Sequence, residues 1–357
     1  MKTTGISTSS IFERMNILTK ELNKDSVKLH EEMVTGQSSD YGLQLGARVT
    51  SILEWEQEKN HIAERLHSNS LVTKRLSTSQ AHLSSMQKIV QDMVGPLVIL
   101  LEGKTDNNKF PINAGMLRDS YESFVTFANM TDEGQYLFSG INSSEKPLNG
   151  YFTKDSLAKK SFDQMLQGFL EENSKSLLAG QHLEVSSMNA QQMTDFIKQL
   201  EDKFSDDEYW ANNWSNASDH NIKYRIKDTE GIDVSANVNM RGIRDIMFVA
   251  VIGTEFLSKN LTDGARNVLT KKMLSTVQQG LSGIIEQRAV LGISEKNINE
   301  ERVFLQNKNN IIDTYISKSI GVEQHTAHAQ LSTLINKIEM SYMITTKLQK
   351  LSILNYL

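Results

Sequence analysis

The chain has 357 residues, enough for two or three domains and a sizeable core. Lys and Arg total 38 against 43 Asp and Glu, and the net charge of −5 gives no overall attraction to nucleic acid or to an anionic membrane. The absence of cysteine excludes disulfide frameworks, Cys-ligated zinc, thiol nucleophiles and iron–sulfur clusters. The composition therefore predicts neither nucleic acid nor membrane as a partner.

The scarcity of proline favours long helices. Only three prolines occur, at positions 96, 111 and 147, so both ends of the chain are free of the commonest helix breaker. The most apolar runs, Val94–Leu101 and Ile246–Leu257, are shorter than the about 18 residues that a membrane-spanning helix needs. The polar start lacks the apolar stretch of a cleaved secretion signal. The cytoplasm is then the default location, and export without a cleaved signal fits the same sequence.

A heptad pattern marks the first predicted helix. Its apolar residues are Ile11, Met15, Leu18, Leu22, Leu29 and Met33. Between Leu22 and Leu29 the pattern passes through Asp25, a polar residue of the kind that fixes register at a cost in stability. Because a lone helix cannot bury such a stripe, this segment needs a helical partner.

Two more helices are predicted before residue 131. A long helical stretch extends over Leu45–Leu97, and Gly95–Pro96 is expected to kink or end it. A shorter helix follows over Ala114–Met130. We interpret Asp132–Gly134 as the end of that helix, with glycine in the cap position, because the segment lacks the alternating oxygen ligands of a calcium loop.

The helical period weakens over residues 140–239, which predicts a small α+β insert. Alternating apolar and polar residues at 222–227 and 232–238 flank Asp228–Gly231, the pattern of a β-hairpin. A helix is predicted over Asn189–Phe204.

From Gly242 the helical pattern returns and ends in a second heptad seam. That seam comprises Leu331, Leu334, Ile338, Tyr342, Thr345, Leu348, Leu351 and Leu354. The predicted fold is mainly α: a long helical-bundle or coiled-coil rod formed by the N- and C-terminal segments, with the α+β insert between them. The expected domains are a terminal coiled coil of 1–40 with 321–357, a helical rod of 41–139 with 240–320, and the insert at 140–239.

Candidate ligand sites are weak. Gly103–Thr105 resembles the end of a phosphate-binding loop, but the glycine that this motif needs is replaced by Val98. His325 and His328, with Glu323 nearby, have no third ligand in a fixed neighbourhood and are interpreted as solvated helix residues.

The acidic segment Asp206–Glu208 is interpreted as a solvated turn. The aromatic residues that follow it, Tyr209, Trp210 and Trp214, are expected to anchor the core of the insert. No spacing indicates a Ser/His/Asp set or a catalytic pair of carboxylates. The sequence thus predicts no catalytic, cofactor-binding or metal-binding residue, and no enzyme.

Three segments resemble the bacterial flagellins and their hook-associated relatives. Ile6–Ser10, with the seam helix and Met33–Gly36, resembles the opening helix of that family and its Ser/Thr-Gly turn. Phe127–Gly140 and the end of the chain, Leu348–Leu357, are similar to the hook–filament junction members of the family. The chain departs from the family in the short segment after Gly36, which lacks a basic residue and an Asp-Asp-Pro-like element.

The resemblance implies a non-catalytic structural adaptor of the bacterial flagellum. It implies export through the flagellar type III apparatus without a cleaved signal, an extracellular location, and terminal seams that are disordered in the monomer and pair on assembly. The implied partners are further copies in a ring, a proximal hook-associated protein, flagellin, and an export chaperone on the C-terminal helix. The thirteen apolar seam residues are the predicted assembly interface, with Ile11–Met33 packing against Leu331–Leu354.

Other functions remain open at this point. The chain could be a flagellin that forms the filament itself, since that protein shares the family. It could be a cytoplasmic coiled-coil scaffold, which the heptad pattern alone would support. An enzyme within the insert is the third alternative, because site residues can be dispersed in sequence.

Overall fold

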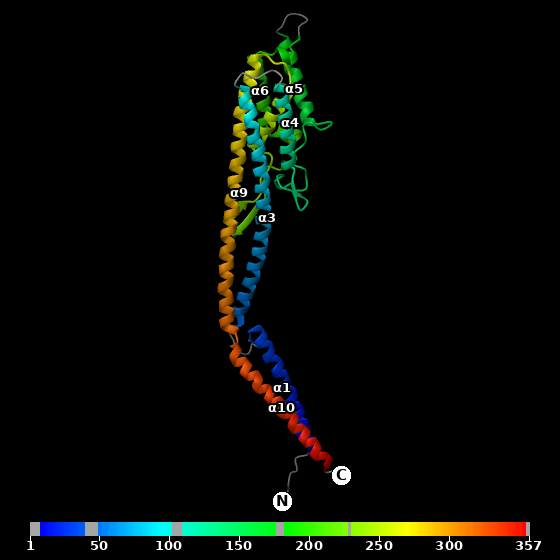
Figure 1. Cartoon of the computed structure of the whole chain (residues 1–357), viewed down its shortest axis with the longest axis vertical. Coiled ribbons are helices and arrows are strands. Elements are labelled where there is room, and N and C mark those ends of the chain that lie inside the picture. Colours follow the sequence, from blue (N-terminus) through cyan, green and yellow to red (C-terminus); the bar gives the residue numbers. More distant parts are fainter. Residues whose placement is uncertain (1–7, 40–48, 102–108, 176–181, 228–229, 355–357) are drawn as a thin grey trace. The chain divides into compact units, whose positions relative to one another are not determined.

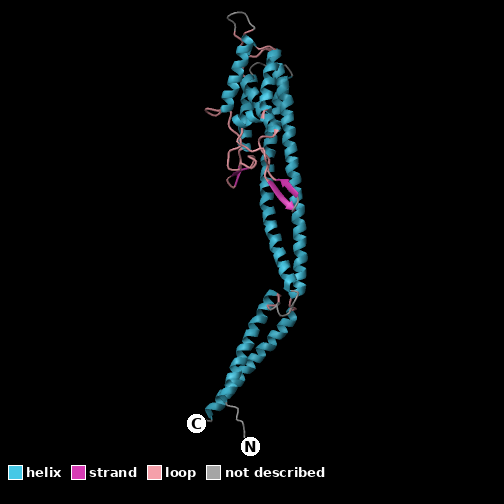
Figure 2. Cartoon of the chain, turned by 180° about the vertical axis from the view of Figure 1, so that it is seen from behind, coloured by secondary structure: helices cyan, strands magenta, loops and turns pink. Residues whose placement is uncertain are grey.

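The computed structural model describes residues 8–39, 49–101, 109–175, 182–227 and 230–354. Contacts divide the chain into two compact units, one comprising Met1–Leu66 and Val303–Leu357, the other His67–Arg302. The elements in chain order are α1 (Thr8–Thr35), α3 (Val49–Leu101), α4 (Lys109–Ala128), β1 (Thr131–Asp132), β2 (Gln135–Tyr136), α5 (Leu157–Ser174), a 3₁₀ turn (Val185–Ser187), α6 (Ala190–Ser205), α7 (Asp207–Asn213), β3 (Lys223–Lys227), β4 (Glu230–Asp233), α8 (Arg241–Phe256), α9 (Asp263–Ile320) and α10 (Gln324–Leu354). The predicted mainly α fold with small β elements is confirmed (Figure 2).

In the first unit the helices pack in pairs. The N-terminal helix α1 (blue) lies alongside the C-terminal helix α10 (red) in Figure 1. The start of α3 meets the end of α9 through an apolar cluster that consists of Ile52, Ile62, Leu305, Ile312, Ile316 and Ile320. Trp55 stacks on Tyr315 with ring centroids 5.5 Å apart, and Lys59 pairs with Asp313 beside them. Residues from opposite ends of the sequence therefore share one unit.

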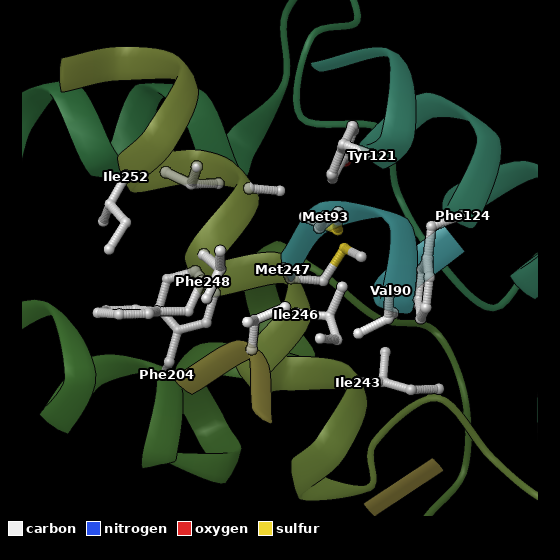
Figure 3. Close-up of a cluster of buried hydrophobic side chains, with 14 of the residues drawn as sticks. Val90, Met93, Tyr121, Phe124, Phe204, Ile243, Ile246, Met247, Phe248 and Ile252 are labelled. Atoms are coloured by element: carbon white, nitrogen blue, oxygen red, sulfur yellow. The ribbon is translucent and has the colours of Figure 1, made fainter. Parts of the chain in front are cut away.

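The core of the second unit is centred on α8. The run Ile246–Ile252 is buried without interruption, as its unbroken apolar sequence requires. Figure 3 shows this run meeting Val90 and Met93 of α3, Tyr121 and Phe124 of α4, and Phe204 of α6. Because one continuous apolar core includes the insert helix α6 and the long helices, the insert does not have a separate core of its own.

Glycines allow α8 and α9 to approach closely. A Cβ atom added to Gly283 of α9 would lie 2.8 Å from the Cα of Gly242 of α8, closer than side-chain carbons come to a backbone atom. Such a methyl group must push the two helices apart and disturb the core around α8.

We expect Gly283→Ala to destabilise the second unit by about 1–3 kcal/mol, since overpacking forces backbone shifts. Gly292→Ala is the matched control in the same helix, because its nearest neighbour, the Gln80 side chain, would lie 3.6 Å away. Urea unfolding followed by circular dichroism measures both variants. Equal unfolding midpoints for the two would contradict the close approach.

Side chains cap the N-termini of α6 and α7 in the insert. The Asn189 side chain accepts a hydrogen bond from the Gln192 amide, and the Gln192 side chain accepts one from the Asn189 amide, which confirms the predicted start of α6. The Asp206 side chain accepts from the Glu208 and Tyr209 amides at the start of α7, and Trp210 and Trp214 are buried behind it. The acidic residues are exposed as predicted, at the start of α7, and the aromatic residues anchor the core shared by the whole second unit rather than a separate core of the insert.

The predicted hairpin is confirmed, but its second strand is shorter and begins two residues earlier than predicted, so Glu230 and Gly231 pair in the strand instead of forming the turn. Strands β3 and β4 pair antiparallel, and β4 begins at Glu230 and ends at Asp233. The hairpin is bound to both long helices: the Tyr224 hydroxyl donates to the Asn69 side chain of α3 at 2.7 Å, and Ser294 of α9 donates to the Asp233 carbonyl at 2.7 Å.

One expectation about helix ends was wrong and another is narrowed. Of the kink or end expected at Gly95–Pro96, the end is excluded, because α3 continues through Pro96 to Leu101. The segment Asp132–Gly134 is not a helix end, because α4 already ends at Ala128. Glu133 and Gly134 both have positive φ, 50° and 81°, and they form the tight turn between β1 and β2.

Candidate assembly surface of the terminal helices

The seam between α1 and α10 follows a strict alternation of three and four residues in both helices. Its buried or half-buried side chains in α1 are Phe12, Met15, Thr19, Leu22, Ser26, Leu29 and Met33. Those in α10 are Ala327, Leu331, Leu334, Ile338, Ser341, Thr345 and Leu348. Each helix therefore has the narrow stripe of an antiparallel coiled coil, with hydroxyl groups at several positions.

A hydrogen bond between Thr19 and Ser341 joins the two helices within the seam. Their hydroxyl oxygens are 2.7 Å apart, and the Thr19 hydroxyl also donates to the Met15 carbonyl at 2.8 Å. Since Thr19 has a single hydroxyl proton, Ser341 is the donor in the bond between the helices. This contact fixes which residues of α1 face which residues of α10.

Most of the predicted seam residues lie at the seam. Those that are half-buried there are Met15, Leu22, Leu29, Met33, Leu331, Leu334, Ile338, Thr345 and Leu348. Ile11 is half-buried beside the seam, where Phe12 holds the seam position. Leu18 and Tyr342 instead face outward, with 45% and 56% of their surfaces exposed. The side chains of Leu351 and Leu354 lie outside the described residues. The role of these residues in assembly stays a prediction.

Sequence reasoning included Thr345 but missed the other polar members of the seam. It followed apolar residues from Met15 to Leu18, whereas the structure places Thr19 inside. In α10 it chose Tyr342, and Ser341 is buried instead. The available signal was the strict alternation itself, which passes from Met15 through Thr19 to Leu22.

Large apolar side chains remain exposed on both terminal helices. The α10 apolar set consists of Ile335, Met340, Tyr342, Met343 and Ile344. The α1 apolar set consists of Ile17, Leu18, Val27 and Val34. These positions lie outside the seam, on several sides of the helix pair. Whether these side chains contact further protein is taken up in the proposed function below.

Where α1 ends, the chain is tied to the segment between α9 and α10. Gly36 has a φ of 69°, which ends the helix in the left-handed conformation. Its carbonyl accepts from the Val322 amide at 3.0 Å, and the Ser38 amide donates to the Ile320 carbonyl at 2.8 Å. These backbone bonds fix the end of α1 next to the start of α10.

Charged groups support the same unit. The buried Glu32 carboxylate accepts hydrogen bonds at 2.9 Å from both the amide and the hydroxyl of Ser39. Near the other helix pair, the hydrogen bond from the Lys308 ammonium lowers the pKa of the Glu58 carboxyl. Both carboxylates thus accept hydrogen bonds from groups of the same chain.

The described residues contain no group of three or more His, Asp or Glu side chains that could hold a metal ion. His325 and His328 are exposed on α10, as expected for solvated helix residues. The Gly103–Thr105 segment lies outside the described residues. Among the described helices, none combines the length and apolarity that crossing a bilayer requires.

Family models match both ends of the chain. The model of the bacterial flagellin N-terminal helical region matches residues 6–143, and the model of the flagellin C-terminal helical region matches residues 274–357. The two matches include α1 and α10 and together cover more than half of the sequence. The chain belongs to the bacterial flagellin family. Flagellin-family proteins are structural components of the flagellum, which is extracellular.

One of three similar solved structures shares the fold of this flagellin-family chain. A protein described as a flagellar hook-associated protein from Vibrio parahaemolyticus aligns with a TM-score of 0.52 at 11% identity, over 76% of this chain and 97% of its own. FlgL from Bacillus cereus gives a TM-score of 0.47 at 12% identity, over 74% and 98%. FlgL from Xanthomonas campestris gives 0.45 at 10% identity, over 77% and 100%. The last two scores are too low to carry an argument. A comparison with curated protein sequences gave no significant match.

Proposed function

We propose that this chain is the adaptor between a hook-associated ring and the flagellin filament, and that it acts without catalysis. The proposal is supported first by the exposed apolar sets of α1 and α10. In the isolated chain these side chains face water, and their burial against neighbouring subunits would contribute about 25 cal/mol per Å² of apolar surface. Assembly is the physical use that best fits such a surface.

The junction role, as distinct from the filament role, rests on two segments. Phe127–Gly140 and Leu348–Leu357 resemble the junction members of the family more than flagellin, which usually closes on a Leu-Leu-Arg-like end. The fold shared with the Vibrio hook-associated protein is consistent with this choice. A flagellin that builds the filament is the alternative within the same family.

The proposed partners follow from this role. Copies of the chain form a ring, with a proximal hook-associated protein on one side and flagellin on the other. Before export, a chaperone covers the C-terminal helix α10, whose exposed apolar set would otherwise aggregate.

Deletion of the gene tests the junction role. We expect cells with hooks but without filaments, and unassembled flagellin in the culture medium, because flagellin has no platform on which to polymerise. Electron microscopy of the cells and immunoblotting of the medium give the two readouts. Intact filaments would reject the junction role, and loss of all flagellin from both cells and medium would favour the filament role.

Tyr342→Asp tests the outward surface without disturbing the seam. The side chain is 56% exposed, so the variant should fold, while a charge in a subunit contact must be desolvated on assembly. We expect incorporation to fall at least tenfold, measured as the amount of variant in purified flagella. Asn336→Asp is the matched control, because it places the same charge at an exposed polar position of α10. Equal incorporation of both variants would show that Tyr342 is not in the contact.

A further inference from the structure

Methionine is the oxidisable sulfur residue of this chain. The sequence has 15 Met and no Cys, so any reaction of a peroxide with sulfur falls on thioethers. Most described Met side chains are buried or half-buried, and three are more than half exposed: Met116, Met340 and Met343. A peroxide in solution is therefore expected to oxidise these three exposed methionines before the buried ones.

Two of these three methionines belong to the α10 apolar set. Met340 and Met343 are 56% and 61% exposed and stand three residues apart, which places them on neighbouring parts of the same helix surface. Ile344 lies next to them and is also exposed, while the intervening Ser341 is buried in the seam. Both sulfur atoms thus lie on the outward side of a helix whose inner side is already covered by α1.

The third exposed methionine provides an internal comparison. Met116 is 52% exposed on α4, in the other unit of the chain. It has nearly the same access to solvent as Met340 but lies outside the terminal helices. Oxidation at this residue would leave the surfaces of α1 and α10 unchanged.

We propose that Met340 and Met343 form an oxidation-sensitive site that decides whether an unassembled subunit can dock. The inference rests on the proposed assembly role of α10. Hydrogen peroxide, or another peroxide, converts these thioethers to sulfoxides while the surface is free. The oxidised subunit then fails to dock onto the flagellum. In a subunit that is already assembled, neighbouring subunits cover the two methionines and shield them from the peroxide.

The reaction is a two-electron transfer of one oxygen atom. A sulfur lone pair attacks one oxygen of hydrogen peroxide, a new S–O bond forms, and the O–O bond breaks with hydroxide as the leaving group. The proton on the transferred oxygen passes to that hydroxide, which leaves as water. The methionine is oxidised to the sulfoxide and hydrogen peroxide is reduced to water. The product is a polar, chiral side chain in place of a flexible apolar one. Burying its S–O dipole against apolar partners leaves a hydrogen-bond acceptor unsatisfied, which opposes docking.

Peptide mass spectrometry of the full chain treated with hydrogen peroxide tests the access. In the free chain we expect Met116, Met340 and Met343 to oxidise at least tenfold faster than the buried Met247. In purified flagella, Met340 and Met343 should become at least tenfold slower, while Met116 shows a smaller change. Equal rates for Met340 and Met343 in free and assembled protein would overturn the proposal.

Incorporation of oxidised subunits tests the consequence. Treated wild-type chain is expected to incorporate at least tenfold less than untreated chain, and methionine sulfoxide reductases with a thiol reductant should restore it. The Met340→Leu/Met343→Leu variant should resist the treatment, and Met116→Leu should remain sensitive. Equal sensitivity of the double-Leu variant and the wild type would overturn the proposal.

The outcome for Tyr342→Asp separates this inference from the proposed function. If that variant is excluded from flagella while oxidised wild type is incorporated normally, α10 is an assembly surface and the methionine site is wrong. If both are incorporated normally, the exposed apolar set of α10 is not an assembly contact, and the proposed use of this surface has itself failed.

Discussion

Leu334→Asp is expected to abolish incorporation of the chain into flagella while the second unit stays folded. Leu334 is half-buried in the seam, where the heptad alternation places it opposite Ser26. A carboxylate there loses the apolar contact and must be desolvated without a partner, a cost on the order of 3 kcal/mol to the pairing of α1 with α10. Because the pair is only two helices thick, no other part of the chain can compensate.

Two measurements distinguish a local effect from misfolding. The melting of the second unit, followed by circular dichroism, should match the wild type, since the core around α8 contains no residue of α10. Asn336→Asp carries the same charge two residues away on an exposed side and should assemble normally. Incorporation of the Leu334→Asp variant into flagella at the wild-type level would refute the seam as an assembly element.

Trp214→Ala should produce the largest loss of stability in the second unit, about 3–5 kcal/mol. Its indole is fully buried and stacks between Tyr151 and Trp210, with ring centroids 5.5 Å and 5.6 Å away and nearly parallel planes. Removing it leaves a large cavity between two aromatic rings. Chemical unfolding of the full chain gives the change in free energy.

Trp214→Phe is the matched control for this cavity. Phenylalanine retains a ring in the stack and lacks the indole N–H, which has no hydrogen-bond partner among the described atoms. The cost should therefore be less than half of that for alanine. If both substitutions lower the free energy of unfolding by the same amount, the stability contributed by Trp214 does not come from packing within the aromatic stack.

The sequence was sufficient to find the terminal helices but not the composition of their seam. Apolar residues are a good guide where Leu29 and Leu331 fill the contact. At Thr19 and Ser341 the guide fails, because the hydroxyls satisfy each other across the helices and can be buried. That compensation is a tertiary contact between residues more than 300 positions apart, and no local pattern contains it.

Tertiary contacts that no local pattern contains also explain what the sequence missed at the helix ends. Proline is a common helix breaker, yet α3 continues past Pro96 to Leu101. Leu97 and Leu100, beyond the proline, are buried in the core of the second unit, and this packing favours continuing the helix. Asp132–Gly134 reads as a cap because Asp and Gly are common at helix ends. Its role as a hairpin turn depends on the pairing of Thr131 with Tyr136, a strand too short to show a period.

The stacked aromatic rings described above give the chain an optical property. Its three tryptophans are distributed between the units: Trp55 lies in the first, on Tyr315, while Trp210 and Trp214 lie together in the second. Emission from Trp55 therefore reports on the packing of α3 against α9 in the first unit, and emission from the other pair reports on the insert. A Trp55→Phe chain isolates the second signal, so the melting of each unit can be followed by fluorescence without attaching a dye.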